Sequence, residues 1–362
     1  MKQNKYIQEC FELFNFSKFE NIIKNFKDMS DPEIQTMVCA SFLQLGEYKG
    51  LLRHITNLPQ EREHQLQEKT ARYLEQTKNK KYDTPLVDII LLTCNREGYV
   101  RKALQELAKT DYPNYRLFIA DNGSTDSTWE EVQKGLRFFP KNVQIFSEQF
   151  PTNIGRPAGH NWLLAKFDHS DAEHIALADD DLVKIPPTWL KDMVKLMEDY
   201  PKAAAVGGKA LNPGLPKVVH GGIRNFTQFS SENIELTNSN DTYDYGQFDF
   251  IDKVDHVIGC LQLYRKKPLF DDIGLFDIRF SPVQFVDIEH HLRTKLHGYD
   301  IIFNGLISFE HYREFGKKSK NDRQYIGNAI GNKIKILYKY DLQEINALLS
   351  QKQAEYKSWL HS

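Results

Sequence analysis

Strand-like and helical segments alternate through the middle of the chain. Strand-like apolar runs occupy residues 86–94, residues 115–126, where the run ends in a turn, residues 143–148, and the start of HIALADDD (174–181). Between them, residues 98–110 and 127–139 carry apolar side chains at helical spacing. A strand that is apolar along its whole length is typical of a parallel sheet covered by helices on both faces. The alternation therefore predicts an α/β fold with a doubly wound, mainly parallel sheet.

The first 80 residues have a different texture, with no strand-like run and apolar side chains at helical spacing. Residues 16–24 (FSKFENIIK) align with residues 45–53 (LGEYKGLLR), close to the repeat length of TPR-like helix pairs. Chance similarity between amphipathic helices is the alternative explanation. We predict an N-terminal all-α domain over 1–80, an α/β domain over 81–316 and a C-terminal helical extension over 317–362.

Composition excludes several classes of protein. The formal net charge is -2, so no global field attracts nucleic acid or an anionic membrane. The four cysteines are scattered without a CxxC pair, which is typical of reduced thiols. The N-terminus has no apolar signal-peptide core, and no run approaches 18 apolar residues. We expect a cytoplasmic chain with no nucleic-acid partner and at most peripheral membrane association.

Three consecutive aspartates, Asp179, Asp180 and Asp181, directly follow one of the buried runs. Adjacent carboxylates repel one another, so this position requires a nearby positive charge. Carboxylates at positions i and i+2 bind a hard divalent ion that also takes diphosphate oxygens. Such an ion neutralises the charge that grows on a leaving diphosphate. We expect Mn²⁺ or Mg²⁺ here; the alternative is an acidic loop that caps the next helix.

Two other strand ends are polar. The first run ends in TCNRE, which includes Thr93, Asn95 and Arg96, and the second ends at Asp121 in DNGSTD. Open α/β sheets bind ligands at the carboxyl ends of their strands. Neighbouring polar ends would form a crevice in which a carboxylate accepts a hydrogen bond from a base N–H.

A further segment, NIGRPAGHN from Asn153 to Asn161, suits an anion. Gly155 permits close approach of the backbone, and Arg156 adds positive charge beside the start of a helix. Neither a P-loop nor a GxGxxG motif is present. The ligand is therefore not held as those two motifs would hold it.

Taken in order, these motifs resemble the signature of family-two glycosyltransferases with the GT-A fold. The resemblance covers about residues 86–315 and includes features similar to galactofuranosyltransferase- and rhamnosyltransferase-like members. The motifs that carry it are LLTCNRE, ADNGSTD, NIGRPAGHN, LADDD and, downstream, GCLQLYRKKPLFDDIGLFDIRF, FVDIEHHLR and GYD.

The resemblance implies roles for single residues. Asp121 would contact a uracil-type base, Asp179 would lie near the ribose, and Asp181 would bind the metal. Asp180 would serve either the donor or the metal. His311, at the end of a later β-type run, would be a further metal ligand. The remaining residues assigned to the nucleotide sugar are Thr93, Asn95, Arg96, Asn153, Gly155, Arg156 and Asn161.

Asp287 matches the catalytic base of the family, although Val286 stands where an acid usually precedes it. Inverting transfer needs a carboxylate opposite the leaving diphosphate to take the proton of the acceptor hydroxyl. The transition state resembles the oxocarbenium ion of glycoside hydrolysis. The alternative role for Asp287 is a cap for the helix that follows it.

These observations predict a metal-dependent, inverting glycosyltransferase. Its donor would be a UDP- or dTDP-sugar, and its acceptor a hydroxyl of a glycan, a lipid-linked glycan or a protein in bacterial surface polysaccharide or glycoconjugate synthesis. The N-terminal helices would bind a protein partner or mediate self-association. One alternative is a sugar-phosphate nucleotidyltransferase, although its Gly-rich loop is missing after the first strand. The other is a non-catalytic nucleotide-sugar-binding scaffold.

Overall fold

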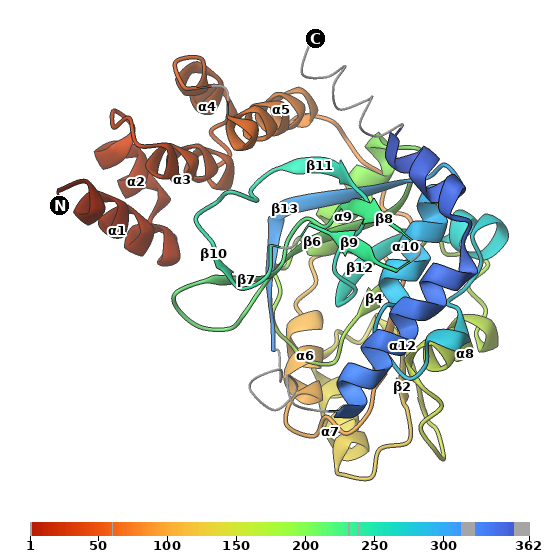
Figure 1. Ribbon diagram of the computed structural model, residues 1–362. Helices are drawn as coiled ribbons and strands as arrows, with labels where there is room; N and C mark the ends of the chain where they lie inside the picture. The colour runs from red at the N-terminus through yellow and green to blue at the C-terminus, as the bar shows by residue number, and fades with distance from the viewer. Residues whose placement is uncertain (1, 60, 231, 238, 313–322, 351–362) are drawn as a thin grey trace.

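The computed structural model describes residues 2–59, 61–230, 232–237, 239–312 and 323–350. A central mixed sheet carries helices on both faces, and a group of helices from the N-terminus lies at one side of it (Figure 1). This arrangement confirms the predicted fold class. The last residues of the predicted α/β domain (313–316) and parts of the predicted extension (317–322 and 351–362) lie outside the described residues.

The elements follow one another along the chain in a regular order. The helices are α1 (Lys2–Asn15), α2 (Phe19–Phe26), α3 (Pro32–Gln44), α4 (Tyr48–Ile55), α5 (Arg62–Thr77), α6 (Val100–Leu107), α7 (Thr128–Gly135), α8 (Arg156–Lys166), α9 (Trp189–Asp199), α10 (Val286–Leu296) and α12 (Arg323–Lys339). The main strands are β1 (Val87–Thr93), β2 (Tyr115–Asp121), β3 (Gln144–Gln149), β4 (His174–Ala178), β5 (Leu182–Lys184), β6 (Ala203–Leu211), β7 (Val218–Gly221), β11 (Ile251–Val254), β12 (Leu261–Arg265) and β13 (Asp300–His311). Short strands β8 (Phe226–Phe229), β9 (Ile234–Leu236) and β10 (Thr242–Tyr243) complete the set.

The internal similarity near the N-terminus corresponds to two equivalent short helices. Ile22 and Phe26 are the buried residues of α2, and Leu51 and Ile55 are the buried residues of α4. Each residue of the first pair lies 29 positions before its counterpart in the second. The longer helix α3 lies between them, and its residues 34–43 are all buried. The repeat in sequence is therefore a repeat of buried positions.

These N-terminal helices also contact the chain near the sheet through buried polar groups. Gln67 on α5 donates to the carbonyl of Gly246 (3.1 Å), and Thr70 Oγ1 accepts from the backbone N–H of Ile251 (2.8 Å). Gly246 has a φ of 86°, and a Cβ there would lie 2.4 Å from the Cβ of Ala40. Only glycine fits this close approach. A role for residues 1–80 as a separate domain stays a prediction.

The sheet aligns the polar strand ends that the sequence singles out. Strands β3, β2, β1 and β4 are parallel neighbours, and β12 runs antiparallel between β4 and β6. Thr93 lies opposite Asp121, which in turn lies opposite Gln149. Since carboxyl ends of parallel strands meet at one edge, these side chains share one end of the sheet.

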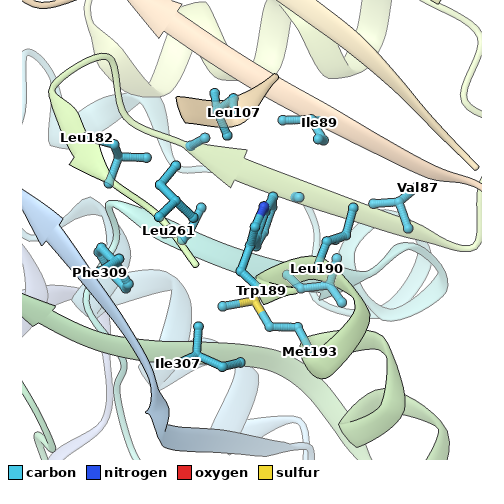
Figure 2. Close-up of a cluster of buried hydrophobic side chains, with 14 of the residues drawn as sticks. Val87, Ile89, Leu107, Leu182, Trp189, Leu190, Met193, Leu261, Ile307 and Phe309 are labelled. Atoms are coloured by element: carbon cyan, nitrogen blue, oxygen red, sulfur yellow. The ribbon is translucent and has the colours of Figure 1, made fainter. Parts of the chain in front are cut away.

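Alternating residues of β1 supply the cores on the two faces of the sheet. Ile89 belongs to a cluster with residues of α6 and α9, whereas Ile90 belongs to one with residues of α8 and α10. Figure 2 shows Trp189 within the first cluster, together with Leu190 and Leu261. Trp189 is fully buried, and its indole N–H donates to Thr110 Oγ1 (2.9 Å). Packing on both faces of the sheet therefore fixes the position of β1, and with it the position of the candidate site.

Candidate functional site

The loops after β1 and β2 are joined by hydrogen bonds into one wall. Asn95 Oδ1 accepts from the backbone N–H of Thr125 (2.8 Å), and the N–H of Asn95 donates to Ser124 Oγ (2.8 Å). The buried carboxylate of Asp121 accepts from the N–H of Ser124 (3.0 Å) and from Gln149 Nε2 (3.1 Å). The structure thus brings Asn95 and Asp121 together, as expected for neighbouring strand ends.

The NIGRPAGHN loop is fastened to the same wall. Asn153 Oδ1 accepts from the N–H of Gly155 (2.8 Å) and from Asn122 Nδ2 (3.1 Å). Asn153 Nδ2 donates to Cys94 Sγ (3.2 Å). Gly155, with a φ of 86°, is the residue that precedes α8. A left-handed glycine lets the chain turn sharply from this loop into the helix.

Two arginines from different loops reach the aspartate triplet. An Arg156 guanidinium nitrogen donates to Asp179 Oδ1 (2.6 Å) and to the carbonyl of Gly259 (3.3 Å). From the loop after β1, Arg96 Nε lies 3.6 Å from Asp180 Oδ1. The structure therefore brings both predicted basic residues to the carboxylates. Neither arginine was expected from spacing alone to contact a particular aspartate.

Asn161 and Thr93 have different surroundings from the other predicted residues. The side chain of Asn161 pairs with the backbone of Phe276, donating to its carbonyl (2.7 Å) and accepting from its N–H (3.0 Å). This pairing attaches α8 to the segment before α10. Thr93 is buried at the end of β1, and its hydroxyl has no hydrogen-bond partner among the described residues.

Asp179, Asp181 and His311 form a cluster suited to a metal ion. One ligand atom from each residue lies within 4.8 Å of the others. Strand β13 places His311 opposite Leu182 of β5, directly beside the triplet. Asp181 Oδ1 and His311 Nε2 are 2.7 Å apart, yet neither buried atom makes a hydrogen bond within the described part of the chain. Two unsatisfied ligand atoms that converge in this way fit a shared cation.

Electrostatics around the triplet are dominated by burial and by mutual repulsion of the carboxylates. Burial together with the neighbouring Asp181 raises the pKa of Asp180 to about 7. Burial opposes ionisation of Asp179 too, but Arg156 and His311 hold its pKa below the ordinary value. Burial opposes protonation of His311, yet the two carboxylates raise its pKa to about 9. The cluster therefore attracts positive charge.

Asp287 lies in the first turn of α10, close enough to Arg156 for the two charges to interact. Its Oδ2 is 3.2 Å from Nε2 of the buried His256, and its side chain is 31% exposed. Burial would raise the pKa of Asp287, but His256 and Arg156 hold it well below its usual range. A Cβ at Gly259 would lie 2.8 Å from Oδ2, so glycine leaves room for the carboxylate. Asp287 is therefore an ionised carboxylate that solvent can reach.

Sequence reasoning missed several residues of this site. The sequence patterns assign no role to His256, Gln149 or His220. His220 Nδ1 lies 3.0 Å from Nδ1 of His311, behind the face that meets the aspartates. Gln149 could have been found from the register of parallel strands, since it lies opposite Asp121. His256 had no such signal, because its contact with Asp287 spans 31 residues of chain.

Parallel strands with polar groups at their carboxyl ends, closed by antiparallel β12, define the GT-A class of glycosyltransferase fold. The crystal structure of GalNAc-T7 with UDP, GalNAc and Mn²⁺ has this fold at a TM-score of 0.55 and 11% identity, over 71% of this chain and 48% of that one. The model of glycosyl transferase family 2 matches residues 88–271, half of the chain. The chain therefore belongs to glycosyl transferase family 2, which confirms the resemblance seen in the sequence.

Two curated relatives illustrate how partial the similarity is. An uncharacterized protein of Sinorhizobium fredii is 26% identical over 63% of this chain and 24% of its own length. A dolichyl N-acetyl-α-D-glucosaminyl phosphate 3-β-D-2,3-diacetamido-2,3-dideoxy-β-D-glucuronosyltransferase of Methanococcus voltae is 28% identical over 34% of this chain and 38% of its own. The chain thus spans about a quarter to two fifths of the length of these relatives.

A helix that crosses a lipid bilayer requires about 20 predominantly apolar residues. Within the described residues, no helix combines the length and the apolar character needed to cross a bilayer.

Proposed function

We propose that the protein is a metal-dependent, inverting glycosyltransferase that transfers a sugar from a UDP- or dTDP-sugar to an acceptor hydroxyl. One observation carries the proposal. Arg156 bonds to Asp179 of the cluster formed by Asp179, Asp181 and His311, and it also interacts electrostatically with the separate carboxylate of Asp287. A site that holds a diphosphate on one side and a base on the other is what such a transfer requires.

The donor would lie along the wall formed by the strand ends. Asp121 would accept a hydrogen bond from the base, with Thr93, Asn95 and Asn153 around it. Arg96 and Arg156 would face the diphosphate beside Asp180. The GalNAc-T7 structure, which shares the fold, contains UDP and Mn²⁺, and this supports a nucleotide-sugar donor with a divalent ion.

Asp179, Asp181 and His311 would hold the divalent ion. Two carboxylates and one imidazole fit Mn²⁺ better than Mg²⁺, which prefers an all-oxygen shell. When bound, the ion would supply positive charge that offsets the charge developing on the leaving diphosphate. His220 would accept a hydrogen bond from His311 Nδ1, which leaves Nε2 of His311 free to face the carboxylates.

The base step would belong to Asp287. Its carboxylate would take the proton of the acceptor hydroxyl while the acceptor oxygen forms a bond to the anomeric carbon. The bond from that carbon to the diphosphate oxygen would break, and its electron pair would leave with the nucleoside diphosphate. Attack opposite the leaving group inverts the configuration. His256 would donate from Nε2 to Asp287 and fix its orientation.

The acceptor would be a glycan, a lipid-linked glycan or a protein in bacterial surface polysaccharide or glycoconjugate synthesis. The Methanococcus voltae relative is named for transfer to a dolichyl-phosphate-linked sugar, which favours a lipid-linked acceptor. Residues 1–80 would act as a helical domain for partner binding or self-association. Membership of a glycosyltransferase family favours glycosyl transfer over a nucleotidyltransferase or a non-catalytic scaffold.

Calorimetric titration of UDP, dTDP and GDP, each with and without Mn²⁺, tests the donor and metal claims together. We expect UDP or dTDP to bind tightly only when Mn²⁺ is present. A panel of the corresponding nucleotide sugars should then release the nucleoside diphosphate, which a coupled assay detects. Equal affinity with and without Mn²⁺ would refute the metal claim, and no turnover with any donor or acceptor would refute the transferase.

A further inference from the structure

Helix α12 carries a row of exposed apolar side chains along one side. Ile326, Ile330, Ile334 and Tyr338 recur every four residues, and 40% to 85% of each side chain is exposed. Residues four apart lie on the same face of a helix, so the four form a continuous stripe. We call these four residues the α12 face. Figure 1 shows α12 along the outside of the molecule, beside α10.

The α12 face is not needed to hold the helix in place. The opposite side of α12 is anchored, with Asn332 and Ile336 buried. Lys339, at the end of the helix, pairs with Glu289 of α10 (2.6 Å). Because the helix is fixed by these contacts, the apolar stripe remains exposed on a rigid support. Large exposed apolar patches of this kind mark interaction sites.

The charged residues of α12 indicate what kind of surface the α12 face would contact. The sequence of α12 contains no Asp or Glu but includes Arg323, Lys333, Lys335 and Lys339, although the whole chain is slightly acidic. Arg323 and Lys335 are exposed. Lys333 and Lys335 donate to the neutral side chains of Asn233 and Asn332 and keep their charge, whereas Lys339 is offset by Asp277 and Glu289. Apolar side chains flanked by cations are typical of helices that lie in the plane of an anionic membrane surface. The cores of protein interfaces, by contrast, are depleted in lysine.

The anchored side of α12 holds the loop that precedes α10. Asn332 Nδ2 donates to the carbonyls of Phe280 (3.0 Å), Val283 (3.0 Å) and Gln284 (2.9 Å). This loop leads directly into α10 and Asp287. Val283 within the loop and Ile278 before it are themselves exposed. Helix α12 is therefore attached to the segment that precedes the proposed base.

We propose that the α12 face docks the protein on the surface of an anionic lipid bilayer. Isoleucine side chains would enter the acyl boundary, Tyr338 would lie at the level of the headgroups, and the exposed cations Arg323 and Lys335 would contact lipid phosphates. Docking on this side would bring the loop before Asp287 close to the membrane. Resting on the proposed function, this orientation selects the lipid-linked glycan among the acceptor classes.

Co-sedimentation with vesicles tests the docking in the full-length protein. The vesicles would contain phosphatidylcholine alone or a 3:1 mixture of phosphatidylcholine and phosphatidylglycerol, a range over which only surface charge differs. We expect binding to the anionic vesicles, weakened by salt. The double variant Ile330→Glu, Ile334→Glu should lower the partition coefficient about tenfold or more, since it places two carboxylates in the stripe.

A matched control carries the same added charge elsewhere. Phe16→Glu with Phe138→Glu alters two exposed apolar residues outside the α12 face, and we expect unchanged vesicle binding. Both double variants should keep their unfolding temperature and their affinity for UDP with Mn²⁺. Retained UDP binding separates failure of docking from failure of the proposed function, because the substituted residues lie outside the nucleotide site.

Three outcomes would overturn the proposal. The first is a wild-type protein that sediments with neither vesicle, and the second is an α12 variant that binds as tightly as the wild type. The third is a sedimentation-velocity result in which the α12 substitutions convert a dimer to a monomer while vesicle binding is absent. That last result would assign the face to a second copy of the chain.

Discussion

The side of the site proposed for the donor and the side proposed for the acceptor are built in different ways. On the donor side, Asn95 and Asp121 are fixed by residues of adjacent strand-end loops. On the acceptor side, Asp287 depends on His256, and the loop before it depends on Asn332 of the C-terminal helix. The first arrangement follows from parallel strands, whereas the second needs contacts between segments far apart in sequence. Substitutions should therefore impair binding on the donor side and chemistry on the acceptor side.

The largest effect should come from Asp287→Asn. The amide keeps the size of the side chain but cannot take the acceptor proton, so transfer should fall by roughly 10³-fold or more. Donor binding should stay within a few-fold, since the base acts in the transition state. Single-turnover kinetics and calorimetry measure the two quantities. The control is Asp271→Asn, at an exposed position. Near-normal turnover of Asp287→Asn would mean that another group is the base.

The next largest effect should appear on the donor side, at the metal cluster. Asp181→Asn removes one anionic ligand atom while preserving shape. The affinity for UDP in the presence of Mn²⁺ should fall about 100-fold. Without Mn²⁺, the variant and the wild type should bind UDP alike. A calorimetric series at several Mn²⁺ concentrations checks this. If the loss were the same with and without metal, Asp181 would contact the nucleotide and not the ion.

Sequence and structure agree best where one strand end is enough to place a residue. The positions of the triplet, Asp121 and Asn95 could be predicted because each follows an apolar run that is typical of a buried parallel strand. The role of His311 was inferred from the resemblance to the family, and the structure brings this residue beside Asp181. His256 and Asn332 could not be predicted, since each acts through a partner that only the tertiary fold brings near.

A smaller, pH-dependent effect should show whether His256 lowers the pKa of Asp287 or only packs against it. The histidine donates to Asp287 and lowers its pKa, so His256→Phe should raise that pKa. The acid limb of kcat/KM would then move to higher pH, with a loss of about tenfold near pH 5 and less at pH 8. His291, Arg156 and Arg224 also face this pair and remain in the variant.

His256→Gln, which keeps an N–H donor, should restore the position of the acid limb. The same linkage affects folding: a depressed carboxyl pKa contributes stability above the ordinary pKa of aspartate and loses it as the pH falls. His256→Phe should therefore reduce the acid sensitivity of unfolding. An equal loss of activity at every pH, without rescue by glutamine, would limit His256 to packing.

The smallest effect should arise furthest from the chemistry, where α5 meets β11. Thr70 Oγ1 accepts from the N–H of Ile251, and Thr70→Val would leave that buried N–H without a partner. Such a group costs about 1–3 kcal/mol, so the free energy of unfolding should fall by that amount in urea titrations. Thr56→Val is the control, because Thr56 is exposed and its hydroxyl donates to the carbonyl of Arg53 in the same segment. Affinity for UDP with Mn²⁺ should not change in either variant. If Thr70→Val left stability unaltered, the N-terminal helices would be joined to the sheet far more weakly than their buried contacts indicate.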